Sequence, residues 1–333
     1  MHHGLSSPIA QGSPHPAAQA GDGELVRGRH TLGDAELTLC SDGSFLLDGG
    51  AMFGVVPKTL WSRRAPADDE NRILLGLNTL AVRLEKALLL VELGLGNKLN
   101  AKQREIHQNH ERLPASLAAA GIRAEDVTHV INTHLHFDHC GWNTTLHADG
   151  SVRPTFPNAR YFCAAGELAH GRLQLDRDRV SYLSPNYDPL IASGQLTLID
   201  LHGTGGFTPD DPRLRNPEDG SLPPPHLQTS PQILPGITVE AFPGHTADML
   251  AVHIESGGQH ACFIGDLFPT SNHLQPTWVM GYDLDPLRCI EERKRFLARA
   301  IPERWLVVFP HDHHVPAAYL RLDEKNRPVA VPL

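Results

Sequence analysis

The sequence lacks long apolar runs and any leader-like start. No segment approaches the roughly 20 consecutive apolar residues that a membrane-spanning helix requires, so we expect no membrane partner. Residues 1–24 contain neither the basic stretch nor the apolar core of a secretory signal. Their bias towards Ser, Pro, Gly and Ala predicts a flexible N-terminal segment, and we expect a cytoplasmic protein.

Cysteine and clustered basic residues are also scarce. The five cysteines form no C-x-x-C pair, so neither a disulfide framework nor a thiolate zinc site is indicated, and we expect them to be buried. The formal net charge is −9, without a cluster of Lys or Arg. Because nucleic acids and anionic membranes bind basic surfaces, we expect neither of them as a partner and favour a small molecule.

The chain does contain short apolar runs that alternate with helical stretches. Of its 333 residues, 41% are hydrophobic, which is enough for a sizeable core. Segments 72–84 and 86–93 predict strands, and the near-continuous apolar character of the second predicts burial on both faces. Segments 97–121 and 285–300 are helical in composition. This alternation predicts an α/β fold, with one domain over residues 25–333.

Two segments have a distinct local character. The Asp42-Gly43 pair in the apolar stretch 35–49 is a strong turn signal and predicts a hairpin there. Residues 202–236 are rich in Pro and Gly and form an insertion without a core of its own. A loop of this length is usually functional or disordered, and we favour an ordered flap beside the site over a floppy insertion.

The stretch NTHLHFDHCG, residues 132–141, concentrates candidate metal ligands. It follows the apolar run VTHVI and carries His134, His136, Asp138 and His139. Alternate residues of an extended chain point the same way, so the first two histidines can bind one cation while Asp138 and His139 turn towards a second. Imidazole and carboxylate groups are ligands for zinc, iron and manganese. Many other histidines lie in polar or loop-like segments without a motif, and we expect them to be solvated or structural: His30, His107, His110, His147, His170 and His202.

Two metal ions need more ligands than one loop supplies. His245, Asp266 and His311 each follow directly after a predicted strand, in the stretches ITVEAFPGHTADM, HACFIGDLFP and WLVVFPHDHH. The carboxyl ends of strands are where an α/β sheet exposes functional groups. We therefore expect these three residues to converge on the 134–139 loop.

This series resembles that of the metallo-β-lactamase superfamily, which carries HxHxDH, then a lone His, a lone Asp and a last His. The resemblance spans about residues 35–320. It implies an αββα sandwich of two mixed β-sheets flanked by helices, with the metal centre at one edge. It also implies a first metal held by His134, His136 and His245, a second held by Asp138, His139 and His311, and Asp266 bridging both.

The resemblance implies hydrolysis with two divalent metal ions as cofactors. Zinc is the first choice, with iron, manganese or cobalt as alternatives. Metal binding lowers the pKa of water from 15.7 to about 7, so a hydroxide bridging the two ions would be the nucleophile. Asp138 could move a proton to or from that oxygen, or it could act as a ligand alone.

Within the superfamily, three stretches look most like the group of N-acyl homoserine lactonases and methyl-parathion-hydrolase-type enzymes. These are GVVPKTLWSRRAPADDENRI, PTFPNARYFCAAGE and GDLFPTSNHLQPTWVMGYDLDP. The lactonases place a tyrosine three residues after the bridging Asp, where this chain has Pro269. Tyr282 or His273 could polarise the substrate instead. Glu92 stands where the superfamily commonly has Asp, and it could brace the ligand loop.

We therefore predict a dinuclear metal-dependent hydrolase of lactone or ester bonds, of the acyl homoserine lactone type, which would make it a quorum-quenching enzyme. Organophosphate triesters are candidate secondary substrates. The alternatives are a glyoxalase II-like thiolester hydrolase and a mononuclear iron oxygenase of the same superfamily. The tryptophan-bearing stretch 52–61 could form a lip over the site or the contact of a homodimer.

Overall fold

The computed structural model describes residues 24–201, 207–208, 211–214, 222–223 and 225–333. The N-terminal segment predicted to be flexible therefore lies almost entirely outside the described residues, as does much of the predicted flap at 202–236. The described part of that insertion adds one edge strand to each of the two sheets, β10 (His226–Gln228) and β11 (Gln232–Leu234).

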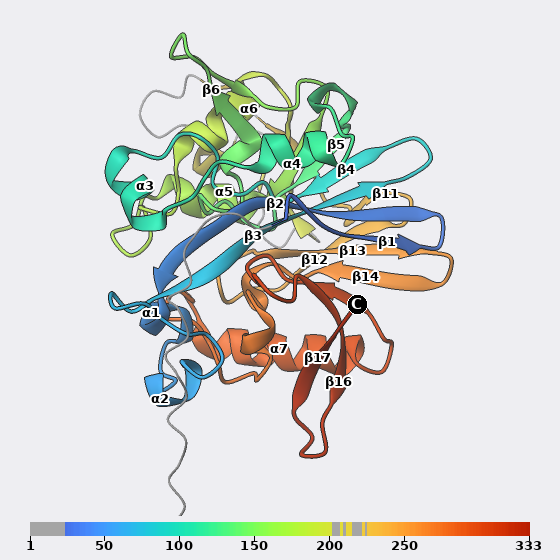
Figure 1. Ribbon diagram of the computed structural model, residues 1–333. Helices are drawn as coiled ribbons and strands as arrows, with labels where there is room; N and C mark the ends of the chain where they lie inside the picture. Colours follow the sequence, from blue (N-terminus) through green and yellow to red (C-terminus); the bar gives the residue numbers. More distant parts are fainter. Residues whose placement is uncertain (1–23, 202–206, 209–210, 215–221, 224) are drawn as a thin grey trace, which may run out of the picture.

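Two mixed β-sheets form the centre of the molecule (Figure 1). Within the described residues the first has the strand order β1-β2-β3-β4-β5-β8-β9-β10 and the second the order β11-β12-β13-β14-β15-β16-β17. The remaining strands of the first sheet are β1 (Val26–Leu32), β2 (Ala35–Asp48), β3 (Arg72–Arg83), β4 (Leu88–Val91), β5 (His129–Ile131), β8 (Arg160–Ala164) and β9 (Leu196–Ile199). Those of the second are β12 (Ile237–Ala241), β13 (Leu250–Ser256), β14 (Gln259–Phe263), β15 (Leu306–Val308), β16 (Ala317–Leu322) and β17 (Pro328–Pro332). A separate small ribbon pairs β6 (Thr144–Leu146) with β7 (Val152–Pro154).

Helices lie outside the two sheets. Figure 1 shows α3 to α6 beside the first sheet and α7 along the outer side of the second. The helices are α1 (Gly49–Phe53), α2 (Lys58–Trp61), α3 (Ala101–His107), α4 (Leu113–Ala119), α5 (Ala165–Arg172), α6 (Asp188–Ala192) and α7 (Pro286–Ala300). No helix among the described residues has the length and apolar content needed to cross a bilayer.

Strand β4 shows why the layers form in this way. Its sequence LLLV is buried throughout, because alternate side chains point into two different cores. Leu89 and Val91 pack between the two sheets, against residues such as Val252 of the second sheet. Leu88 and Leu90 pack on the outer side with helix α4. The predicted αββα sandwich is confirmed.

The prediction of a hairpin at Asp42 is wrong. Residues 35–48 form one continuous strand, β2, whose register with β3 shifts between Ser41 and Ser44. Asp42 does not turn the chain, because its buried carboxylate accepts hydrogen bonds from the backbone of Leu95 and Leu113 and from the indole of Trp142. These contacts stabilise a bulge in the strand. The Asp-Gly pair lies in this bulge, and the chain does not reverse its direction there.

Strand direction explains how distant residues reach one edge of the sandwich. Strands β12, β14 and β15 run the same way, because β13 is antiparallel to both β12 and β14 while β14 and β15 are parallel. In the first sheet, β4, β5 and β8 are also mutually parallel. Residues that follow β12, β14 and β15 therefore leave the second sheet at a common edge.

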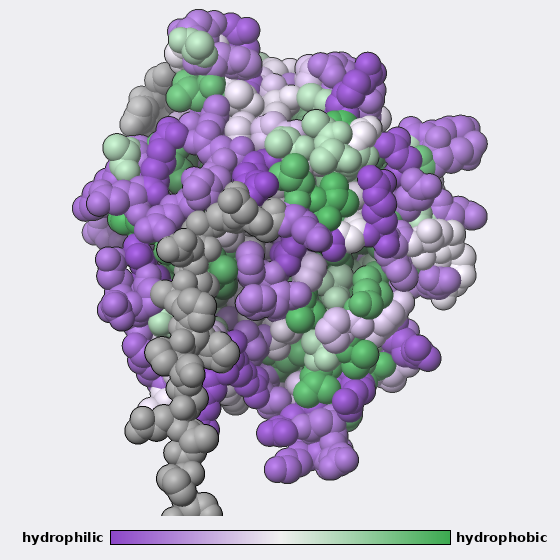
Figure 2. All heavy atoms as spheres, viewed as in Figure 1, coloured by the Kyte–Doolittle hydropathy of each residue, from purple (hydrophilic) through white to green (hydrophobic). Residues whose placement is uncertain are grey.

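The outer surface in view is mostly hydrophilic, and apolar side chains gather in patches across its middle (Figure 2). The edge strands β1 and β17 contribute to a hollow of about 440 Å³, whose lining includes Leu37, Leu306 and Pro332. All five cysteines are free and buried, as expected.

Candidate metal centre

The 134–139 loop begins three residues after β5 and is buried. His134 and His139 are at most 1% exposed, and His136 and Asp138 are 9% exposed. The loop is held against β4, because the backbone N–H of Leu93 donates to the carbonyl of His139. The strand and the loop thus fix the four candidate ligands next to each other.

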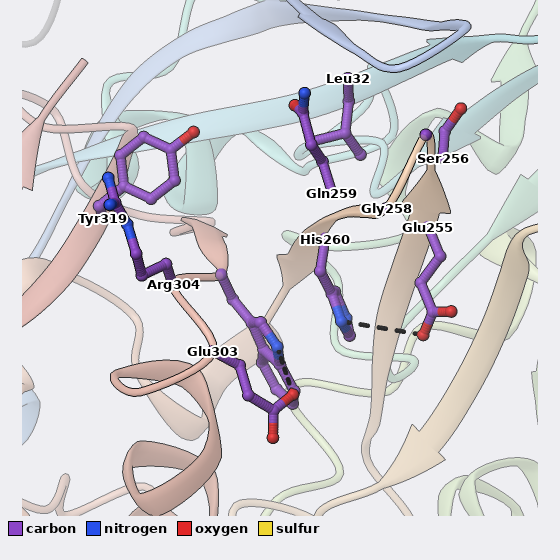
Figure 3. Close-up of a pocket in the computed structure, with 11 residues that line it drawn as sticks. Leu32, Glu255, Ser256, Gly258, Gln259, His260, Glu303, Arg304 and Tyr319 are labelled. Atoms are coloured by element: carbon purple, nitrogen blue, oxygen red, sulfur yellow. Dashed lines mark hydrogen bonds and ion pairs between the residues drawn. The ribbon is translucent and has the colours of Figure 1, made fainter.

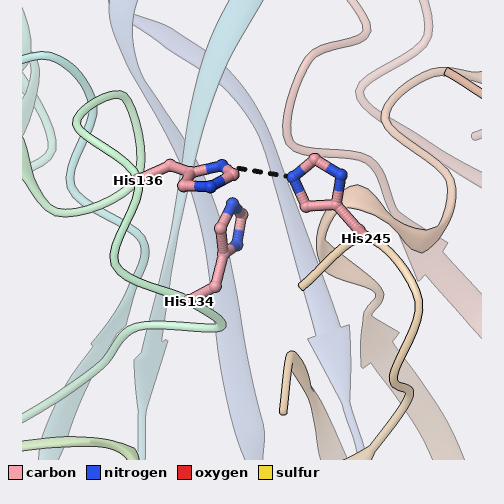
Figure 4. A group of neighbouring side chains, drawn as sticks. All are labelled: His134, His136 and His245. Atoms are coloured by element: carbon pink, nitrogen blue, oxygen red, sulfur yellow. Dashed lines mark hydrogen bonds between the residues drawn. The ribbon is translucent and has the colours of Figure 1, made fainter. Parts of the chain in front are cut away.

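The predicted convergence of the distant residues is present. His245 lies between β12 and β13, Asp266 follows β14, and His311 follows β15. Together with the loop they form three groups whose potential ligand atoms lie within 4.8 Å of one another. These are His134 with His136 and His245, His134 with His139 and Asp266, and Asp138 with His139 and His311. Figure 4 shows the first group, with the ring of His136 facing that of His245.

Asp266 lies between the other residues. Its Oδ2 is 3.4 Å from Nε2 of His245 and 3.6 Å from Nε2 of His139, and its Oδ1 is 3.3 Å from Nε2 of His311. One carboxylate therefore faces both the first and the third group. Asp138 belongs to the third group, and its Oδ2 is 3.6 Å from Nε2 of His311.

The outer nitrogens of three of the rings are held by acceptors of the protein. Nδ1 of His245 contacts Oδ1 of Asp283 at 3.0 Å, and Nδ1 of His311 contacts the carbonyl of Gly76 at 3.0 Å. Nδ1 of His139 contacts the carboxylate of Glu92. These acceptors fix the proton on Nδ1, which leaves the lone pair of Nε2 directed to the centre.

This arrangement fits metal ions. Nε2 of His139 and Nε2 of His311 are 3.1 Å apart, and Nε2 of His245 and Nδ1 of His136 are 3.2 Å apart. Two lone pairs of neutral rings at this distance repel each other unless a metal ion or a proton lies between them. A tetrahedral zinc ion with bonds of about 2.0–2.1 Å separates its ligand atoms by about 3.3 Å. In addition, Nε2 of His134 is buried without a hydrogen-bond partner.

The residues of the cluster shift one another's pKa values. Burial raises the pKa of Asp266, but His311, His139 and His245 together hold it well below its usual value. Burial and the neighbouring histidines lower the pKa of His134 well below its usual value. Asp266 is therefore an ionised carboxylate and His134 a neutral imidazole, the states that bind metals.

Glu92 supports the loop. Its Oε1 accepts the backbone N–H of Thr133 at 2.5 Å, while its Oε2 contacts His139. Burial lowers the pKa of His139, but Glu92, Asp266 and Asp138 raise it well above its usual value. Glu92 adopts a positive φ of 64° at the end of β4, which turns the chain away from the sheet. Glu92 therefore makes the contacts expected of a residue that braces the 134–139 loop.

A cavity of about 410 Å³ opens onto the ligand cluster. Asp138, His136, His245, Asp266 and His311 lie in its lining. Its walls add apolar side chains at Leu47, Met52, Ile106, Phe137, Val180 and Leu284, and polar or charged ones at Asn100, Lys102, Gln103, His107, Arg177, Asp178, Ser181 and Tyr282. The cavity thus combines apolar and polar walls above the candidate metal ligands and has a size suited to a small molecule.

The two candidates for polarising the substrate lie in different places. Tyr282 lines the cavity, and burial with the nearby carboxylates of Asp48 and Asp138 raises its pKa to about 12. His273 is fully buried outside that lining. Its Nδ1 contacts the hydroxyl of Thr270 at 2.8 Å, and its Nε2 contacts the carbonyl of Met52 at 2.9 Å. Its ring nitrogens are thus already engaged within the core.

Sequence reasoning missed His107. This residue ends α3 and lines the cavity, with its ring centroid 5.2 Å from that of Phe137. We expected it to be solvated or structural. Nothing in its local sequence separates it from the other histidines, because its position depends on how α3 packs across the loop that contains Phe137.

A further hollow, of about 810 Å³, lies at the turn between β13 and β14 (Figure 3). Its lining includes Glu255, His260 and Trp305. The turn is at the opposite end of β13 and β14 from His245 and Asp266. None of the three ligand groups found in the described residues lies there.

The comparisons with known proteins agree with this geometry. The sequence profile of the family described as "Metallo-beta-lactamase superfamily" matches residues 73–311. A probable metal-dependent hydrolase from Staphylococcus aureus superposes with a TM-score of 0.74 and is 27% identical, covering 91% of this chain and 99% of its own.

Two further solved structures are similar in fold. The hydrolase AbOPH of the beta-lactamase superfamily has a TM-score of 0.70 and 19% identity, covering 92% of this chain and 96% of its own. AidC, a dizinc quorum-quenching lactonase in complex with N-hexanoyl-L-homoserine as product, has a TM-score of 0.68 and 20% identity, covering 93% and 98%. With the family profile spanning most of the chain, this protein belongs to the metallo-beta-lactamase superfamily.

Proposed function

We propose that this protein is a dinuclear metal-dependent hydrolase that cleaves lactone or ester bonds. The observation that carries the proposal is the position of Asp266, whose two carboxylate oxygens face His245 on one side and His311 on the other. A carboxylate in this position can bridge two cations about 3.5–4 Å apart. The seven predicted ligands, His134, His136, Asp138, His139, His245, Asp266 and His311, are the residues we assign to metal binding.

The chemistry follows from what the ions supply and what the chain supplies. Two divalent ions would lower the pKa of water and polarise the oxygen of the bond to be cleaved. Asp138 lies in the cavity lining beside the third ligand group, where its carboxylate can hold a proton that passes to the leaving group. Tyr282 keeps its phenolic proton at neutral pH and can donate a hydrogen bond to the substrate. Between the two candidates, the contacts favour Tyr282 over His273.

The cavity supports a substrate with an apolar arm. Ile106 and Val180 are 43% and 71% exposed, although both are apolar and line the cavity. Apolar residues exposed at a cavity often mark the binding of an apolar group. An acyl lactone or acyl ester combines such an arm with a carbonyl that the ions would polarise. AidC is a lactonase that contains a homoserine product, and this similarity in fold adds to the proposal. Organophosphate triesters are proposed as secondary substrates.

Zinc is the metal we propose. Five imidazoles and two carboxylates form the cluster, and zinc accepts both kinds of ligand in tetrahedral or five-coordinate sites. Iron, manganese and cobalt accept the same ligands, so elemental analysis of the purified protein must accompany every activity assay.

The test is a substrate panel measured on protein of known metal content. Acyl homoserine lactones, aryl esters, an aryl phosphotriester, a β-lactam and a glutathione thiolester are compared at equal enzyme concentration. We expect about two metal ions per chain and the highest kcat/KM for a lactone or an ester. Preferred turnover of the thiolester, or one bound iron with oxygen uptake, would replace this proposal with one of its two alternatives.

A further inference from the structure

A second buried carboxylate lies behind the first ligand group and has no part in the proposed chemistry. Glu167 belongs to the first turn of α5 and is fully buried. Its Oε1 accepts a hydrogen bond of 2.6 Å from the hydroxyl of Tyr182. The same oxygen accepts the backbone N–H of Leu135 at 3.4 Å. A buried carboxylate is costly unless it is hydrogen-bonded, so these contacts hold the segments that make them.

Both hydrogen bonds of Glu167 connect it to His136. Leu135 lies between His134 and His136, so its N–H fixes the backbone that carries the two rings. The ring of Tyr182 packs against that of His136 in a T-shaped arrangement, with centroids 4.9 Å apart. Tyr182 is 2% exposed, and its hydroxyl bond to Glu167 anchors the ring. Glu167 therefore acts on His136 from the backbone and from the side.

Helix α5 also contacts the loop that carries His245. Burial raises the pKa of Glu167, and the side chain of the neighbouring Thr246 opposes that shift, as Tyr182 does. At the start of the helix, Gly166 lies directly against the carboxylate of Asp248. A Cβ at Gly166 would lie 1.6 Å from Oδ2 of Asp248, so only glycine permits this approach. The first turn of α5 thus packs directly on residues 246–248.

Glu92 holds the other side of the centre in the same way. It accepts the backbone N–H of Thr133 and contacts His139, whereas Glu167 accepts the N–H of Leu135 and reaches His136 through Tyr182. The ligand loop is therefore held between two buried carboxylates, one on each side.

We propose that Glu167 and Tyr182 are positioning residues that hold His136 and His245 in place for the first metal ion. This inference rests on the proposed assignment of His134, His136 and His245 as metal ligands. Loss of a partner that orients a ligand typically weakens metal binding about 10–100-fold. The effect should be confined to the first ion, because neither residue contacts His311 or Asp138 in the described contacts.

Tyr182→Phe is the main test variant, since it removes the hydroxyl and retains the ring. Glu167→Gln keeps an acceptor and should have a smaller effect than Glu167→Ala. Tyr161→Phe is the matched control, because Tyr161 is also buried and its hydroxyl bonds the backbone of Phe156 and Asn143 rather than a group behind a ligand. Zinc dissociation constants are measured by competition with a chromophoric chelator, with circular dichroism and melting temperature as checks of folding.

The decisive measurement compares two backgrounds. In His311→Ala, which leaves the first group intact, Tyr182→Phe should raise the zinc dissociation constant about 10–100-fold. In His136→Ala, where the first group is already disabled, it should add nothing. Tyr161→Phe should have no effect in either background.

The outcomes separate this inference from the proposed function. If the wild type binds two ions and turns over its substrate but Tyr182→Phe leaves zinc binding unchanged, the inference alone is overturned. Equal weakening in both backgrounds also overturns it, because the residues would then act on the fold as a whole. A wild type without bound metal overturns the proposed function and the inference together.

Discussion

A cluster of histidines near the start of strand β13 and a second one on β13 and β14 differ in how their nitrogens are satisfied. Near the start of the strand, the inward nitrogens of the ligand cluster face one another, as between His139 and His311 at 3.1 Å. Within the strand, Nδ1 of His253 contacts Nε2 of His260 at 2.9 Å, and Nε2 of His253 lies 3.1 Å from the carboxylate of Glu240. In this second cluster one proton can satisfy the ring-to-ring contact.

The pKa values show how the ring-to-ring contact of the second cluster is satisfied. Burial lowers the pKa of His253, but Cys262 and Glu240 raise it to about 10. Burial and the charge on His253 lower the pKa of His260 to about 4. At neutral pH one ring is therefore charged and the other is neutral, so a donor faces an acceptor. Among the described residues the second cluster also forms no group of three convergent ligands.

The comparison teaches that the density of histidines does not identify a metal centre. What identifies it is the convergence of several lone pairs that the protein itself does not satisfy. In the ligand cluster, Glu92, Asp283 and a carbonyl fix outer nitrogens, while Nε2 of His134 and Nε2 of His136 are buried without a hydrogen-bond partner. The second cluster resolves its charges internally, as a structural ion network does.

The largest expected effect comes from removing one acid from each cluster. Asp266→Ala should lower turnover more than about 100-fold and reduce the metal content by at least one ion per chain, because it removes the group that faces both ligand sets. Glu240→Gln should keep turnover per folded molecule and lower the free energy of unfolding by about 1–3 kcal/mol, since charged His253 loses its anion. Steady-state kinetics, elemental analysis and urea unfolding measure the two variants side by side. Full activity in Asp266→Ala would remove the basis for the comparison.

Removal of metal should affect stability through the ligand cluster and not through the cluster of His253 and His260. A ligand present at 100 times its dissociation constant stabilises a protein by about 2.7 kcal/mol, so stripping the ions with a chelator should lower the melting temperature clearly. Glu240→Gln should show the same drop on chelation as the wild type, because its cluster binds no ion. Differential scanning calorimetry with and without added zinc measures both proteins. A melting temperature that does not respond to the chelator would contradict a resident metal.

The fold and the ligand cluster were predictable from the sequence because their signals are local and repeated. Each ligand after the first loop follows an apolar strand, and parallel strands bring such positions to one edge whatever the details of packing. The continuous apolar run at 88–91 similarly required covers on both faces. The spacing of the motif therefore determined much of the site.

What could not be predicted depends on contacts between distant segments. The Asp42-Gly43 pair has a strong local preference for a turn, but three donors from other segments, at Leu95, Leu113 and Trp142, satisfy Asp42 inside a continuous strand. His107 reaches the cavity only through the packing of α3. Glu167 gives no signal in sequence, since its importance lies in what Tyr182 and Leu135 do around it.

A smaller effect is expected from the phenol in the cavity. Tyr282→Phe should reduce kcat/KM about tenfold, as the loss of one hydrogen bond to the reacting oxygen would, and should leave the metal content unchanged. His273→Gln is the informative companion, because His273 is engaged in the core by Thr270 and Met52. It should lower the melting temperature and leave kcat/KM of the folded fraction nearly intact. The reverse pattern would assign substrate polarisation to His273.

The smallest expected effect concerns the pH dependence of stability in the second cluster. His260 has a folded pKa of about 4, below the value of about 6.5 in the unfolded chain, so the unfolded state binds more protons between these values. The free energy of unfolding should therefore fall as the pH drops from about 6.5 to about 4. His260→Gln removes this proton uptake and should flatten the decline by about 1 kcal/mol. Urea unfolding at several pH values, on metal-stripped protein so that the ligand cluster binds no ion in either variant, measures the difference. Identical slopes in wild type and variant would show that the charge on His253 does not oppose protonation of His260.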